Sequence, residues 1–123
     1  MNELILKSLD RLKRSSFRSK FTLNDKDRLY IEDKGIETIR SHAFDFITSR
    51  VAPQFPKNDG RQTPMKGHPV FIAQHATATC CRGCIKKWHE IRKEKVLTSD
   101  EITFIVDLLM KWIEGQIRDC GSM

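Results

Sequence analysis

The sequence predicts a mostly α-helical protein of five or six helices, folded as a single domain over residues 1–123. The chain of 123 residues has the length of one domain, and 39% of its residues are hydrophobic. Apolar residues recur at helical spacing in several separate stretches. Gly and Pro number only 6 and 4, too few for a disordered or collagen-like chain. These observations favour a small helical fold with a modest core.

The N-terminal half is expected to hold three helices. The first covers residues 2–12, where leucine and isoleucine follow a helical period. The second follows Asn24, a candidate N-cap with aspartates in the first turn, and stops at Gly35. The third covers residues 36–51, and a proline lies just past its end.

The longest irregular stretch covers residues 52–69 and is rich in proline and glycine. A loop of this length is often functional, so we expect a functional loop here. Pro69 then opens a short apolar run that could be a strand or a helix with proline at its first position. A helix is favoured, because no partner strand is found nearby.

Two further helices complete the predicted fold. One covers residues 82–91 and opens at the cysteines. The other covers residues 98–118, begins at a capping box formed by Thr98 and Glu101, and has the strongest amphipathic pattern in the chain. This last helix is therefore expected to be the core helix.

The segment of residues 67–91 contains most of the side chains that could bind a metal ion. Three of the four cysteines and three of the four histidines fall within residues 68–89. Cys81 and Cys84 form a C-x-x-C pair, a spacing that lets a tight knuckle aim both sulfurs at one ion. A helix that starts after the knuckle would lower the pKa of the thiols through its dipole. This pattern predicts a metal site, with Zn²⁺ as the expected cofactor.

The candidate metal ligands include residues on both sides of the C-x-x-C pair. Cys81 and Cys84 rank first, followed by His75 and Cys80, and then by His68 and His89. On a helix, His89 would lie about 140° around the axis from Cys84. This angle argues against a site in which both residues bind the same ion.

Other readings of the cysteines stay open. The thiols could be small buried apolar groups, and the C-x-x-C pair could be a redox dithiol. An iron–sulfur cluster usually takes four thiolates, and the fourth cysteine, Cys120, lies in the C-terminal tail and is treated as incidental.

The charge distribution is uneven. Lys and Arg number 22 against 16 acids, which gives a net charge of +6. Six bases lie in residues 7–20, within a basic N-terminal helix and connector that cover residues 1–20, and six more lie in residues 82–95. If the two stretches share a face, they would attract DNA or RNA. The candidate nucleic-acid contacts are Lys13, Arg14, Arg18, Arg82, Lys86 and Lys87.

Residues 57–65, with the motif GHPVFIAQHATATCCRGC and the KWH that ends at His89, resemble a family of small bacterial and phage proteins. That family is known only as a domain of unknown function. The resemblance extends from about Phe17 to Ile113. It implies that the chain is a member of this family, and it does not imply any particular activity.

The leading functional prediction is a small cytoplasmic metal-binding protein that contacts nucleic acid. It has no expected membrane contact, because no apolar run approaches the ~18 residues of a membrane span. The first alternative is a metal-dependent hydrolase such as a nuclease. His68 or His75 would then be the general base, and Arg82 would stabilise phosphate charge. A further alternative is a protein-interaction module.

Overall fold

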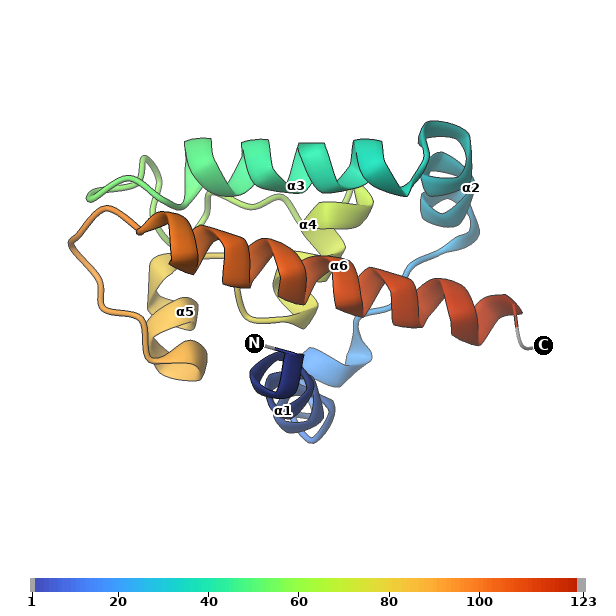
Figure 1. Ribbon diagram of the computed structural model, residues 1–123, viewed down its shortest axis with the longest axis horizontal. Coiled ribbons are helices and arrows are strands. Elements are labelled where there is room, and N and C mark those ends of the chain that lie inside the picture. The colour runs from blue at the N-terminus through green and yellow to red at the C-terminus, as the bar shows by residue number, and fades with distance from the viewer. Residues whose placement is uncertain (1, 122–123) are drawn as a thin grey trace.

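Six α-helices and one 3₁₀ turn form the computed structural model, which describes residues 2–121 and the side chains of residues 3–118 (Figure 1). No strand occurs within residues 2–121, which confirms the mostly α-helical prediction. The elements are α1 (Asn2–Lys13), η1 (Arg18–Lys20), α2 (Asp25–Lys34), α3 (Ile36–Arg50), α4 (Pro69–Ala76), α5 (Arg82–His89) and α6 (Ser99–Gly121).

The helix α6 is the centre of the packing. It contacts α3, α4 and α1, and Figure 1 shows α3 and α6 running alongside each other. The fully buried side chains of α6 belong to one hydrophobic cluster with α3 and α4, whose members include Ile39, Ile47, Val70, Ile105, Leu109 and Ile113. This confirms α6 as the core helix. Within residues 2–121, no helix is long and apolar enough to cross a bilayer.

Capping residues explain why α2 begins and ends where the sequence predicts. The side chain of Asn24 accepts a hydrogen bond of 2.8 Å from the amide of Asp27, and the side chain of Asp27 accepts one in return. Gly35 ends the helix with a φ of 87°, a conformation that favours glycine. Both signals are local, so they could be read from the sequence.

The starts of α4 and α6 are also determined by local sequence signals. Pro69 occupies the first turn of α4, so the apolar run after it is a helix and the strand alternative is wrong. Before α6, the amide of Glu101 donates to the Thr98 hydroxyl at 3.1 Å, and the Thr98 amide donates to the Glu101 carboxylate at 2.8 Å.

The irregular stretch between α3 and α4 is anchored by Arg82, which is only 1% exposed. Its guanidinium donates to four backbone carbonyls on two loops, those of Val51 (3.2 Å), Pro53 (3.1 Å), Arg92 (2.8 Å) and Lys95 (3.0 Å). These contacts correct the prediction that Arg82 contacts phosphate. The side chain instead fixes the start of α5, next to the cysteines.

Candidate metal centre

Three cysteine sulfurs meet at the start of α5. The Sγ atoms of Cys80, Cys81 and Cys84 all lie within 4.8 Å of one another, and those of Cys81 and Cys84 are 3.3 Å apart. Sulfurs around a tetrahedral zinc ion lie about 3.8 Å apart, given a Zn–S distance of about 2.3 Å. The three side chains are therefore close enough to hold one metal ion.

The C-x-x-C geometry is produced by the N-terminus of α5. Cys81 is the N-cap residue, with extended backbone, and its sulfur accepts a hydrogen bond of 3.4 Å from the amide of Cys84. This arrangement turns both sulfurs toward the same side of the first turn. It confirms that the helix opens directly after the knuckle.

Cys80 is placed by a buried polar network between α4 and α5. The Gln74 side chain donates to the carbonyl of Thr79 at 3.1 Å and to the hydroxyl of Thr63 at 3.3 Å. The Thr63 hydroxyl in turn donates to the carbonyl of Cys80 at 2.7 Å. Because Gln74 and Thr63 come from the helix and from the long loop, both elements fix the backbone that carries Cys80.

Arg18 is the charged residue in contact with the cluster. It is 8% exposed. Its guanidinium donates to the carbonyl of His75 at 2.7 Å and to the sulfur of Cys84 at 3.1 Å, and it lies 3.8 Å from the sulfur of Cys80. The structure thus corrects the assignment of Arg18 to nucleic acid. No local pattern separates it from the other bases of residues 7–20.

Burial and hydrogen bonding shift the pKa values of the three thiols in different directions. A hydrogen bond from the Cys84 thiol, with a further contribution from Arg18, lowers the pKa of Cys80 to about 7. Burial raises the pKa of Cys81. The hydrogen bond to Cys80, together with burial, raises the pKa of Cys84. Binding of a metal ion would displace the protons that these thiols carry.

No histidine joins the three-cysteine group among the described residues. Nε2 of His75 contacts the carbonyls of Thr63 at 3.2 Å and Pro64 at 3.1 Å. Nε2 of His89 contacts the carbonyl of Thr77 at 2.7 Å, and burial lowers the pKa of this ring. The geometry therefore corrects the expectation that His75 or His89 completes the ligand set. The side chain of Cys120 lies outside the described residues.

His68 forms a pair with His42 that the sequence did not predict. Nδ1 of His68 accepts from the amide of Val70 at 3.0 Å and so caps α4. Nε2 of His68 must then carry the proton, and it donates to Nδ1 of His42 at 3.0 Å. Burial, aided by the charge of His42, lowers the pKa of His68 to about 4.

These contacts bear on the hydrolase alternative. His68 uses both ring nitrogens inside the fold, His75 contacts two carbonyls, and Arg82 is enclosed by carbonyls. Each of the three candidate catalytic residues therefore makes contacts that stabilise the fold.

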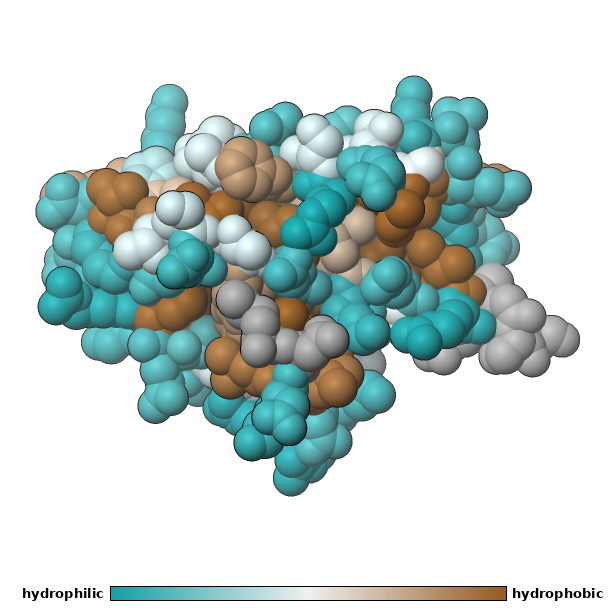
Figure 2. Space-filling model, viewed as in Figure 1, coloured by the Kyte–Doolittle hydropathy of each residue, from teal (hydrophilic) through white to brown (hydrophobic). Residues whose placement is uncertain are grey.

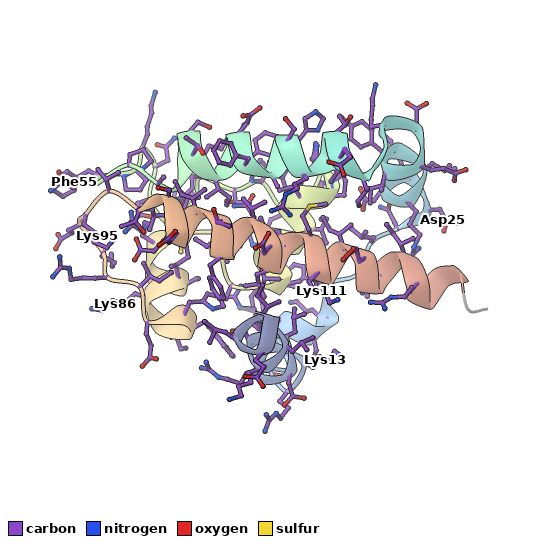
Figure 3. All side chains as sticks on the ribbon, viewed as in Figure 1. Lys13, Asp25, Phe55, Lys86, Lys95 and Lys111 are labelled. Atoms are coloured by element: carbon purple, nitrogen blue, oxygen red, sulfur yellow. The ribbon has the colours of Figure 1, made fainter. Side chains whose placement is uncertain are left out.

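The other four predicted nucleic-acid contacts are exposed. Lys13 and Arg14 lie at the end of α1, and Lys86 and Lys87 lie on α5. The two helices touch, because Arg11 donates to the carbonyl of Trp88 at 3.1 Å and lies over its ring. Figure 3 labels Lys13 and Lys86 on these neighbouring helices.

No solved structure shows a significant match to the chain. The family described as "Domain of unknown function (DUF4186)" matches residues 7–114, which include all three clustered cysteines and Arg18. The match agrees with the resemblance carried by the cysteine and histidine segment. The chain belongs to this family.

Proposed function

We propose that Cys80, Cys81 and Cys84 bind a zinc ion and that a fourth coordination position is left for water or another ligand. The observation that carries this proposal is the convergence of three sulfurs within 4.8 Å. Thiolates are soft donors and select Zn²⁺, Cu(I) or iron–sulfur clusters over Mg²⁺ or Ca²⁺. A site with three protein ligands and an open position is the arrangement of reactive rather than closed structural zinc.

The charge balance around the sulfurs supports the same proposal. Three thiolates and one divalent cation carry a net charge of −1, and the guanidinium of Arg18 lies 3.1 Å from the sulfur of Cys84. A buried charge needs such a partner, and a second group that hydrogen-bonds a ligand also orients it. Arg18 would therefore hold the thiolates in place and balance the charge of the loaded site.

The metal would also tie together elements that are distant in the sequence. Arg18 belongs to η1, Cys80 to the segment after α4, and Cys84 to α5. Metal binding would add its free energy to the stability of this junction. A cytoplasmic setting fits the proposal, because reducing conditions keep thiols available for a metal.

The test is the metal content of protein purified without chelator. We expect about one zinc per chain, a marked loss in Cys80→Ser, Cys81→Ser and Cys84→Ser, and a lower melting temperature in each of these variants. Cys120→Ser is the matched control, because it removes a thiol elsewhere in the chain, and it should keep its metal. Equal loss in Cys120→Ser would overturn the open fourth position, and wild-type protein without bound zinc would overturn the metal site.

A second candidate function is contact with nucleic acid through the neighbouring helices α1 and α5. The contact of Arg11 with Trp88 favours it, because this contact brings the two basic stretches together. The bases expected to take part are Lys13, Arg14, Lys86 and Lys87, all of them exposed. Phosphate contacts of this kind make affinity fall with rising salt, which is the property to measure.

A further inference from the structure

A groove of about 790 Å³ lies between α1, the segment of η1 and the residues after it, and the second half of α6. It is separate from the three sulfurs and from the face formed by Lys86 and Lys87. Arg18 is the residue it shares with the metal centre, since its side chain lines the groove and its guanidinium contacts Cys84. Lys13, on the rim of the groove, is also one of the bases expected to contact nucleic acid.

Part of the lining of the groove is apolar. Leu6, Leu9 and Leu12 line it from α1, and Trp112 lines it from α6. Leu6 is 53% exposed, although Leu12 on the same helix is buried. Figure 2 shows hydrophobic side chains at the surface of the lower part of the molecule, over α1. Exposed leucine that borders a groove with a buried apolar wall is a surface suited to an apolar ligand.

The rim of the groove is cationic. Lys13, Lys111 and Arg118 line it, and the one carboxylate in the lining, that of Asp10, is paired with Arg14. Figure 3 labels Lys13 on α1 and Lys111 on α6, the two helices that border the groove. Among the described side chains, positive charge therefore exceeds negative charge at this rim, and a ligand with an anionic group would be attracted to it.

We infer that this groove binds a small amphipathic anion, an aliphatic chain that ends in a carboxylate. The leucines would cover the chain, and Lys13 and Lys111 would pair with the carboxylate. An aliphatic chain fits better than a nucleobase, because α1 offers leucines to the groove and one of the two aromatic side chains in the lining, Phe21, already stacks on His75 at 5.6 Å between ring centroids.

The test is titration calorimetry of the metal-loaded full chain with dodecanoate below its micellar concentration. We expect one dodecanoate per chain. Leu6→Asn should weaken binding about fivefold through lost apolar contact, and Lys13→Gln about threefold through a lost ion pair. The matched controls are on the same helix and outside the groove: Leu4→Asn, at a site 55% exposed, and Lys7→Gln.

Dodecyltrimethylammonium has the same chain length and the opposite charge, so it should not bind. The inference is overturned if dodecanoate does not bind, if the cation binds equally well, or if the control variants weaken binding as much as the groove variants do. Oligonucleotide binding that Leu6→Asn weakens as much as it weakens dodecanoate binding would also overturn it, because the groove would then be a nucleic-acid site. Binding that survives loss of the metal in Cys81→Ser would support it independently of the zinc proposal.

Discussion

The guanidinium of Arg18 lies 3.1 Å from the sulfur of Cys84, 66 positions later in the sequence. The same group holds the carbonyl of His75 at 2.7 Å. One side chain therefore connects η1 to the end of α4 and to the first turn of α5. A residue in this position can orient the thiolates and offset their charge, even though it cannot itself bind a metal cation.

Replacement of Arg18 with methionine should weaken metal binding. The variant keeps apolar bulk but removes the donors to sulfur and the positive charge, and loss of such a partner typically costs about 10–100-fold in metal affinity. The measurement is competition for zinc with a chromophoric chelator. Arg14→Met is the control, because Arg14 is exposed and pairs with Asp10. Equal affinities in the two variants would show that Arg18 does not support the site.

Replacement of Arg82 with methionine should destabilise the fold. Four carbonyls would lose their donor inside the protein, and a buried polar group left unpaired costs about 1–3 kcal/mol. We expect a total loss of about 3 kcal/mol or more, measured by urea unfolding. Lys86→Met changes an exposed base on the same helix and should cost little. A small effect in Arg82→Met would mean that water replaces the guanidinium between the two loops.

Stability should fall with acid in a way that depends on His68. The pKa of His68 in the folded protein is about 4, below its usual value of 6.5, so the unfolded chain binds more protons between these two values. The contribution of neutral His68 is therefore fully present above pH 6.5 and is lost as the pH falls toward 4.

The variant that tests this is His68→Asn, since asparagine can cap α4 but does not titrate. Melting temperatures measured from pH 7 to pH 4 should decline less steeply in the variant than in the wild type. Parallel declines would show that the pair formed by His68 and His42 is not the group that titrates.

The double variant Lys86→Gln, Lys87→Gln should weaken binding to DNA or RNA and flatten its salt dependence by about two phosphate contacts. Lys26→Gln, Lys34→Gln removes the same charge from α2 and is the control. Filter binding at several salt concentrations measures both slopes. The same loss in the two double variants would show that net charge alone, and not the face of α1 and α5, drives binding.

The helices could be predicted well from the sequence, because the ends of a helix depend on residues that are close together along the chain. Asn24 with Asp27, and Thr98 with Glu101, each form a capping box within three residues. Such signals can be recognised in the sequence, because the residues that form them are close neighbours along the chain. The short 3₁₀ turn that carries Arg18 has no side-chain cap, and the sequence did not reveal it.

The site was predicted only where its geometry is local. The pair of Cys81 and Cys84 comes from one helical turn, so its spacing was sufficient. Arg18 contacts Cys84, 66 positions away, and His68 contacts His42, 26 positions away. Hydrophobic periodicity in the sequence does not predict contacts between residues so far apart. His75 and His89 were ranked as ligands for their nearness in sequence, but their rings contact backbone carbonyls.

Zinc-edge X-ray absorption of the purified protein tests the central proposal most directly, because it counts the sulfur ligands around the metal. We predict three sulfurs at about 2.3 Å and one lighter ligand, nitrogen or oxygen, at about 2.0–2.2 Å. The three sulfurs are those of Cys80, Cys81 and Cys84, so whatever zinc Cys81→Ser retains should have two sulfur ligands. Four sulfurs, or a first shell of nitrogen and oxygen alone, would contradict a three-cysteine centre with an open position.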